Sequence, residues 1–344
     1  MSEFRYSDSN KRYYTLDYYY KHKYGCKIAK ISLNMGLTCP NKDGKVGYGG
    51  CIYCSKLGSG EYAGDKNKPL KEQFDEVKNV MIKKWPSAKF IAYFQANTNT
   101  YAPIEKLKKA WEEVLTYDNV VGINISTRPD AIEKECYDYL EELNKKTDLV
   151  VELGLQTIHD KTSKFINRCH DLNSFETALN ELNKRGIKVL VHVMFSLPYE
   201  TKDMMLDTIK YLSNKNIWGI KIHMLHILKG TLLAKIYEQE KFPILTKDEY
   251  VQIVCDSLEL LPENIVINRL TGDPKVDDLI EPFWLVKKFC VLNDIDKEMA
   301  RRDSYQGKMY KRSWKNFSFF YFSSWITPSR TSLSTNCGLL SLST

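Results

Sequence analysis

A regular alternation of short β-rich runs and helical stretches is the feature that most constrains the fold of this chain. The helical stretch 71–85 is typical, with Phe74, Val77, Met81 and Trp85 at three- and four-residue steps. Such alternation indicates parallel strands joined by right-handed crossovers. The pattern therefore predicts an α/β fold, either a partial (β/α)6 TIM-type barrel or an open doubly wound sheet. Six runs are expected to be strands: 28–33, 89–95, 119–126, 148–156, 187–195 and 217–225.

The alternation weakens after about residue 240, which sets the predicted domain boundaries. We expect the barrel core to span 26–240 and a small C-terminal extension to span 241–312. Residues 1–25 are expected to form a basic, aromatic N-terminal arm. The tail 313–344 has no acidic residue, and 13 of its 32 residues are Ser or Thr. This composition predicts a segment that is disordered or foreign to the domain.

Positive charge is concentrated at the two ends of the chain. Residues 1–30 carry seven Lys or Arg against three Asp or Glu, and residues 301–344 carry seven against one. Within 11–25 the basic residues are interleaved with tyrosines. Because cations attract phosphate and aromatic rings stack on unpaired bases, one interpretation is nucleic-acid contact. The other is a solvated basic arm whose tyrosines pack on the barrel.

Targeting and membrane signals are not found in the sequence. It has no charged-then-apolar N-terminus typical of a signal peptide and no apolar run of membrane-spanning length. We therefore expect a cytoplasmic protein with no membrane partner. In that reducing compartment the nine cysteines are not expected to form a disulfide framework, and clustered thiols there more often bind metal.

Three cysteines lie close together in the loop after the first predicted strand. Cys39, Cys51 and Cys54 are spaced C-x11-C-x2-C. A structural zinc ion usually takes four ligands, and Cys26 precedes the strand, at the opposite end of about 20 Å of chain. An iron–sulfur cluster held by three thiolates would instead leave one iron without a protein ligand. An open coordination position of that kind is typical of catalytic metal centres.

The segment TCPNKDGKVGYGGCIYC (38–54) resembles the cluster loop of the radical S-adenosylmethionine (SAM) superfamily. Its stretched first gap is similar to that of the YhcC-like family, a relative of the Elongator catalytic subunit and of oxygen-independent coproporphyrinogen oxidase. The resemblance covers roughly residues 5–310. The further matching motifs are STRPD (126–130), ELGLQT (152–157), INRCHD (166–171), HVMFSLPYET (192–201), KIHMLHILKGT (221–231) and RRDSYQGK (301–308).

The resemblance implies that Cys39, Cys51 and Cys54 bind a [4Fe–4S] cluster whose fourth iron is chelated by SAM. One-electron reduction then cleaves SAM to methionine and a 5′-deoxyadenosyl radical, which abstracts hydrogen from a substrate in the barrel mouth. Flavodoxin or ferredoxin is implied as the electron donor. Tyr53 takes the place of the aromatic residue that the superfamily keeps near the adenine.

Several other residues are implied as SAM contacts. QANTNT (95–100) replaces the superfamily's Gly-Gly-Glu element, so Gln95 or Asn97 is expected to hold the methionine amino group. Glu152 lies inside an apolar strand and needs a partner, either SAM or a protein cation, and the resemblance favours SAM. Arg128 is interpreted either as a ligand for a carboxylate or phosphate or as the partner of Asp130. The remaining implied contacts are Ser126 and Gln156.

Other polar residues receive no assigned function. His192 and His223 lie within apolar strands and are interpreted as core histidines. The role of Lys30 in the first strand stays open, and no catalytic residue is identified. Cys169 stands where relatives have glycine.

The substrate is inferred from the ends of the chain and from the resemblance. Basic, aromatic-rich ends and kinship with the Elongator subunit suggest tRNA, with the side chain of a wobble uridine as the target. Two alternatives stay open. One is a radical SAM enzyme that acts on a small molecule, and the other is a non-enzymatic RNA-binding protein stapled by zinc.

Overall fold

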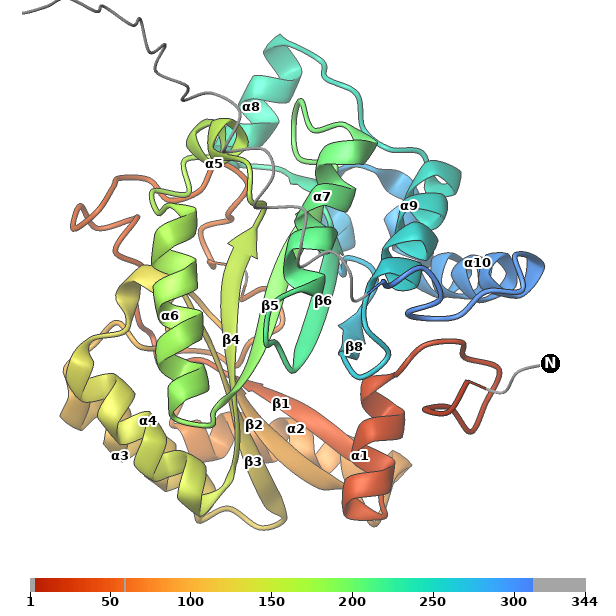
Figure 1. Ribbon diagram of the computed structural model, residues 1–344. Coiled ribbons are helices and arrows are strands. Elements are labelled where there is room, and N and C mark those ends of the chain that lie inside the picture. The colour runs from red at the N-terminus through yellow and green to blue at the C-terminus, as the bar shows by residue number, and fades with distance from the viewer. Residues whose placement is uncertain (1–3, 59, 312–344) are drawn as a thin grey trace, which may run out of the picture. The chain divides into compact units, whose positions relative to one another are not determined.

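A seven-stranded parallel sheet forms the centre of the computed structural model, which describes residues 4–58 and 60–311 (Figure 1). The strand order, β1-β2-β3-β4-β5-β6-β8, follows the chain and never reverses. A doubly wound sheet requires such a reversal, so the half-barrel prediction is confirmed and the alternative is wrong. The bounds are Ile28–Leu33 (β1), Lys89–Phe94 (β2), Val120–Thr127 (β3), Asp148–Gln156 (β4), Lys188–Phe195 (β5), Gly219–Met224 (β6) and Val266–Arg269 (β8).

Helices follow the strands and lie along one face of the sheet (Figure 1). They begin at side-chain caps in several places; Asp171, for example, accepts a hydrogen bond from the backbone N–H of Ser174 at 2.8 Å. The helices between the strands are α2 (Leu70–Lys84), α3 (Ile104–Leu115), α4 (Lys134–Lys146), α5 (Asp160–Phe165), α6 (Leu172–Lys184), α7 (Lys202–Ser213), α8 (Leu232–Gln239) and α9 (Lys247–Leu260).

The two faces of the sheet differ sharply in chemistry, because successive side chains of a strand point to opposite faces. On β4, Val151 and Leu153 belong to the main apolar core under the helices, whereas Glu152 lies on the other face. On β6, Ile220 and Ile222 join the same core, and Lys221 faces the other way. The strands that contain Glu152, His192 and His223 are therefore apolar only on the helix-covered face; the inner face is polar and lines a cavity.

Several elements add to the predicted pattern. Strand β8 lies within the expected C-terminal extension, yet it pairs with β6 and completes the barrel sheet. A 3-10 turn, Pro129–Ala131, precedes α4. Another 3-10 turn, Phe283–Lys287, leads into α10 (Lys288–Arg301). Two short strands, β7 (Ile227–Leu228) and β9 (Leu279–Glu281), pair antiparallel outside the main sheet.

The N-terminal segment is part of the barrel wall and not a free arm. Its helix α1 (Leu16–Tyr24) lies beside β1 and β8, and Thr15 forms a parallel bridge with Ile267 (Figure 1). Tyr13 and Tyr20 are buried, at 5% and 3% exposure. The basic residues are largely paired, as in Lys23 with Asp148 at 2.6 Å. Of the two interpretations of this segment, packing on the barrel is the one that the structure realises.

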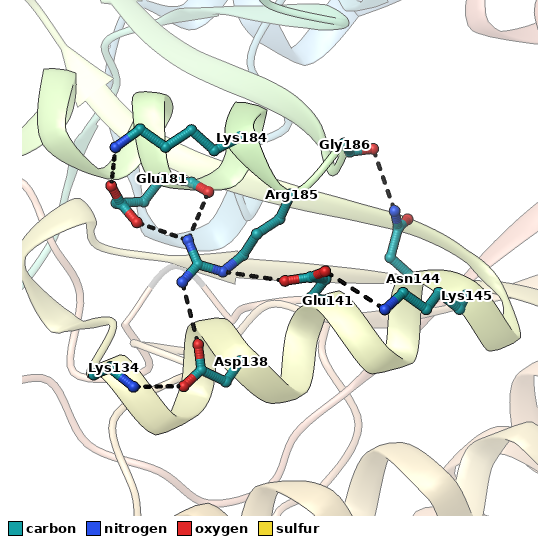
Figure 2. A network of polar contacts seen from close by, with 9 residues as sticks. All are labelled: Lys134, Asp138, Glu141, Asn144, Lys145, Glu181, Lys184, Arg185 and Gly186. Carbon is teal, nitrogen blue, oxygen red and sulfur yellow. Dashed lines mark hydrogen bonds and ion pairs between the residues drawn. The ribbon is translucent and has the colours of Figure 1, made fainter.

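Figure 2 shows an ion-pair network between α4 and α6 on the outside of the barrel. Arg185, at the end of α6, contacts Asp138 at 3.2 Å, Glu141 at 3.7 Å and Glu181 at 2.7 Å. One guanidinium thus joins both helices, and Asn144 adds a bond to the backbone oxygen of Gly186 at 3.2 Å. The network lies between the two helices, and none of its residues lines the polar cavity.

Within 4–58 and 60–311, no helix combines the length and apolarity needed to cross a membrane. The predicted tail 313–344 lies outside the described residues. The described residues up to Tyr310 form one compact unit. The domain boundaries at 25 and 240 stay predictions.

Candidate active site

The cysteine loop is anchored at the carboxyl end of β1 by backbone hydrogen bonds to distant segments. The backbone N–H of Ile52 donates to the oxygen of Ile166 at 3.0 Å, and the N–H of Leu233 donates to the oxygen of Ile52 at 2.9 Å. Gly49 and Gly50 both have positive φ, at 76° and 82°, which turns the chain just before Cys51 at little steric cost. These contacts hold the second half of the loop against the C-terminal side of the barrel.

Cys39, Cys51 and Cys54 all line one cavity of about 460 Å³. None of them forms a disulfide bond. The volume falls within the range of about 300–1,000 Å³ that is usual for sites of small molecules and cofactors. The cavity occupies the carboxyl ends of the strands, where chemistry is expected in barrel enzymes. The structure therefore brings together the three cysteines that the sequence singled out, and leaves Cys26 in a separate apolar cluster.

The surroundings of Cys51 favour its thiolate. A hydrogen bond with Cys54 is the largest cause that lowers the pKa of Cys51, to about 6, and it outweighs burial, which raises the pKa. The positive charge of Arg128 and the amide of Asn41, 3.7 Å from the Cys51 sulfur, act in the same direction as Cys54. Deprotonated thiolates are the form that binds metal.

The three thiols suit a cluster better than a single ion. Within 4–58 and 60–311, no three or more His, Cys, Asp or Glu side chains are grouped closely enough to hold one metal ion. A [4Fe–4S] cluster does not require such a group, because each thiolate binds a different iron atom. The donor set, three cysteines on one cavity wall, fits a cluster with one iron left free of protein ligands and gives no support to a zinc staple.

Two arginines flank the cysteines. Arg128 forms a bidentate ion pair with Asp130, at 2.9 and 2.7 Å, so the salt-bridge interpretation of this residue is realised. Arg168, which the sequence reasoning missed, is only 1% exposed and forms no ion pair with a carboxylate in the described part of the chain. Its Nη1 donates to the backbone oxygen of Thr157 at 2.7 Å, and its buried Nη2 has no partner. A buried guanidinium N–H at the cavity wall is a strong donor without an acceptor.

The other predicted cofactor contacts also reach the cavity. Gln95 and Gln156 line it, and neither side chain has a hydrogen-bond partner among residues 4–58 and 60–311. Asn97 is engaged at both ends, since its Nδ2 donates to the Leu37 oxygen at 3.0 Å and its Oδ1 accepts from Lys42 at 3.1 Å. Gln95 is therefore freer than Asn97 to bind a ligand. Tyr53 and Ser126 line the same cavity.

Glu152 requires a correction. Sequence reasoning favoured SAM as its partner, but the side chain is fully buried and does not line the cavity. Its Oε1 accepts from Lys30 at 3.2 Å and from Asn124 at 2.7 Å. Its Oε2 accepts from His192 at 2.7 Å and from Lys221. Protein donors thus supply the partner that a buried carboxylate needs, and Glu152 acts by positioning two lysines.

The inner face of the barrel contains functional groups that the sequence reasoning left unassigned. Lys221 and Tyr93 are hydrogen-bonded at 3.1 Å, and both line the cavity. His192 is a satisfied histidine, as expected, but the buried Nε2 of His223 has no partner, so the core interpretation of His223 is incomplete. The signal that could have found these residues is their period of two along strands whose alternate positions are apolar.

The chain is similar to known proteins along most of its length. The profile of the Radical SAM superfamily matches residues 35–212, and that of the Radical_SAM C-terminal domain matches residues 217–301. The chain belongs to the radical SAM superfamily. The superfamily uses a [4Fe–4S] cluster and SAM, so the protein is a radical SAM enzyme with these two cofactors and a reductant partner.

Two relatives match over most of their own length and most of this chain. The chain is 48% identical to protein YtqA of Bacillus subtilis over 309 residues, covering 90% of this chain and 96% of that protein. It is 30% identical to protein YhcC of Escherichia coli over 293 residues, covering 85% and 93%. The predicted YhcC-like membership is therefore confirmed.

A more distant relative is the tRNA uridine(34) acetyltransferase of Methanocaldococcus jannaschii, 26% identical over 157 residues, which covers 44% of this chain and 28% of that protein. Among solved structures, Elp3 of Methanocaldococcus infernus is similar with a TM-score of 0.61 at 17% identity, over 82% of this chain and 64% of that one. This likeness confirms the fold.

Proposed function

We propose that Cys39, Cys51 and Cys54 hold the [4Fe–4S] cluster and that SAM binds beside it in the same cavity. The observation that carries the proposal is that three cysteines, none of them in a disulfide, line one cavity together with polar side chains that lack partners in the described part of the chain. When bound and reduced, the cluster supplies the electron that cleaves SAM and starts radical chemistry on the substrate. The chain's own residues bind, orient and shield the reactants.

The polar groups of SAM have matching partners in the cavity wall. The buried Nη2 of Arg168 lacks an acceptor, so it suits the methionine carboxylate. The side-chain oxygen of Gln95 suits the amino group, in place of the missing Gly-Gly-Glu element. Tyr53, adjacent to Cys51, suits the adenine. Ser126 and Gln156 complete the proposed set. Flavodoxin or ferredoxin is the proposed reductant.

We further propose that the substrate is tRNA and that the side chain of a wobble uridine is the target. Kinship with the tRNA uridine(34) acetyltransferase supports this choice. Support also comes from three exposed lysines without ion pairs within 4–58 and 60–311, on the two helices that adjoin the cysteine loop. They are Lys161 and Lys164 on α5 and Lys235 on α8.

A tRNA gel shift tests the proposed contact. Charge reversal of the three lysines (K161E, K164E and K235E together) should weaken binding and make its salt dependence shallower, because phosphate contacts are lost. The matched control reverses Lys106 and Lys109 on α3, which are exposed and have no ion pair with any described residue. If both variants bind tRNA equally well, the proposed surface is wrong.

The modified nucleosides of tRNA test the substrate itself. Cells that lack the gene should lose one modified uridine or accumulate its precursor, and the wild-type gene should restore it. A variant with Cys51→Ala should not restore it, which separates radical chemistry from mere RNA binding. An unchanged nucleoside profile would contradict tRNA as the substrate.

A small-molecule substrate is the second candidate, and a specific observation favours it. The basic residues of the N-terminal segment are largely consumed in ion pairs, such as Arg12 with Asp303 at 3.0 Å and Lys23 with Asp148 at 2.6 Å. The cavity itself is rich in buried polar groups. Normal nucleosides together with a changed set of small metabolites in the deletion strain would select this candidate.

A further inference from the structure

The floor of the cavity carries an excess of positive charge. Six Lys or Arg residues line the cavity, against two acidic residues, Glu61 and Asp273. Those two acids are already engaged. Glu61 accepts from the hydroxyl of Ser55 at 2.5 Å, and both oxygens of Asp273 accept from Lys288 at 2.9 Å. Lys288 therefore neutralises Asp273, whereas Glu61 keeps its negative charge because a hydroxyl is uncharged. The six cations of the lining still outnumber it.

The cations form two groups at different places in the cavity. Arg128 and Arg168 act on the Cys51 thiol, so they belong to the cofactor end. Lys42 belongs to the same end, because it donates to the backbone oxygen of Ser55 at 3.3 Å and to Asn97 at 3.1 Å. The second group is named here the basic floor and lies on the inner face of three strands. It consists of Lys30 (β1), Lys221 (β6) and Arg269 (β8), with His223 beside them.

Glu152 neutralises only part of the basic floor. Each of its two oxygens already accepts two hydrogen bonds, so its acceptor positions are occupied. It contributes one negative charge against the positive charges of two lysines and one arginine. The pair with Lys221 and the contact with Lys30 at 3.2 Å also hold these ammonium groups in place.

Donors are left over on the cavity side. Arg269 lines the cavity, is exposed, and forms no hydrogen bond or ion pair with any residue in 4–58 and 60–311. The buried Nε2 of His223 likewise has no partner. A positively charged floor with unpartnered donors is complementary to an anion, and charge-assisted hydrogen bonds of this kind are about twice as strong as neutral ones.

We propose that the basic floor binds an anionic oxygen group of the substrate, a carboxylate or a phosphate, and so fixes the substrate beside the SAM site. This inference rests on the proposed function and names the chemistry that its substrate must carry. A tRNA would present a phosphate, and a small molecule would present either group. Arg269 and His223 contact the anion, while Glu152 holds Lys30 and Lys221 in position.

Anion titration of the holoenzyme tests the proposal. Cluster-loaded protein saturated with SAM is titrated calorimetrically with sulfate, which mimics a phosphate group, and with malonate, which presents carboxylates. At least one probe should bind, and the better one identifies the class of anion. Saturating SAM ensures that its own carboxylate site is already filled.

Arg269→Gln is the decisive variant, because its side chain has no protein partner to disrupt. We expect it to weaken probe binding about tenfold, the loss usual for one good charged contact. Lys106→Gln, on the outer helix α3, should bind as the wild type does. Lys221→Met serves as a second variant, with its folding checked by thermal unfolding because it deprives Glu152 of a partner.

Two results would overturn the inference. They are failure of both probes to bind the SAM-saturated wild type, and equal binding by the wild type and Arg269→Gln. SAM cleavage measured on the same preparations distinguishes failure of the proposed function from failure of the basic-floor proposal. Cleavage without anion binding rejects only the basic floor, whereas anion binding without cleavage rejects only the proposed function.

Discussion

At the scale of single residues, the site depends on which thiols surround the cavity and which do not. Cys39, Cys51 and Cys54 line it. Cys169 does not line it. Desolvation is the largest cause that raises the pKa of its thiol, and it is close enough to Cys39 and Cys51 for their charges to add to that rise. It is exposed and donates to Asn167 at 3.2 Å. Proximity alone would therefore allow Cys169 to be a fourth cluster ligand. Substitution distinguishes a cluster held by three cysteines from one held by four.

Replacing Cys51 by alanine should abolish the cluster, because two thiolates cannot hold it in place. Cys169→Ala is the matched control and should keep the wild-type content of iron and sulfide. The check is iron and sulfide analysis with the visible absorption spectrum after anaerobic reconstitution. Loss of iron in both variants would mean that Cys169 is a ligand and that no iron is left open.

The basic floor should lose affinity for anions as the pH rises through about 7. Burial is the largest cause that lowers the pKa of Lys221, to about 7, and Glu152 only partly opposes it. Below that pH Lys221 is charged and attracts the anion; above it the attraction is lost. The groups that face it are Lys30 (β1), Tyr93 (β2), Glu152 (β4), His192 (β5), His223 (β6) and Arg269 (β8).

The neighbours of Lys221 leave it as the group that titrates. The pKa of Glu152 is held well below its usual range, and burial raises that of Tyr93 and lowers those of His192 and His223. Sulfate is the right probe, since it does not titrate between about pH 6 and about pH 8. Calorimetry across this range should show affinity falling with pH in the wild type, and a flat profile would contradict the assignment.

At the scale of elements, the N-terminal helix α1 is a structural part of the barrel. Tyr20 is 3% exposed and packs with Ile28 of β1 and Ile91 of β2. Its aromatic ring is what matters, because its hydroxyl is buried without a partner. Deleting this segment would therefore remove barrel wall, and point variants are the better probes of any RNA contact.

Tyr20→Ala should lower the free energy of unfolding by about 3 kcal/mol, since a large buried side chain is lost. Tyr20→Phe should be neutral or slightly stabilising, because it removes only the unpartnered hydroxyl. Denaturant unfolding measures both. Equal stability of Tyr20→Ala and the wild type would show that α1 is dispensable for the barrel.

The sequence predicted the elements that repeat and missed those that do not. Strands β1 to β6 were found because their apolar runs recur between helices. Helix α1 was missed for two reasons. Its five aromatic or histidine residues favour helix only weakly, and its sequence shows no clear apolar stripe at helical spacing. Strand β8 was assigned to the extension because α8 and α9 intervene before it.

The site residues that lie close together in the sequence were predictable, and those that meet only in the folded barrel were not. The three cysteines fall within sixteen residues, so spacing alone identified them. The basic floor joins Lys30, Glu152 and Lys221, which lie 122 and 69 positions apart and meet only because parallel strands bring alternate side chains to one face. Sequence reasoning could see that Glu152 needed a partner, but not which residue across the barrel supplies it.

At the scale of the whole molecule, the outer face of the sheet contributes to stability and the inner face carries the candidate site. The outer face of the sheet packs against helices in one large apolar core, and the α4–α6 network ties that layer together (Figure 2). The inner face is polar and forms a single cavity that joins the cysteines to the basic floor. In the proposed arrangement, SAM and the anionic group of the substrate would therefore occupy the same cavity.

The account depends on an iron atom that carries no protein ligand and is free to bind SAM. Electron paramagnetic resonance of the dithionite-reduced, cluster-loaded protein, recorded before and after addition of SAM, tests this point most directly. We predict that SAM shifts the g-values of the reduced cluster, because it binds the cluster itself. A spectrum that stays the same at saturating SAM would contradict the central claim.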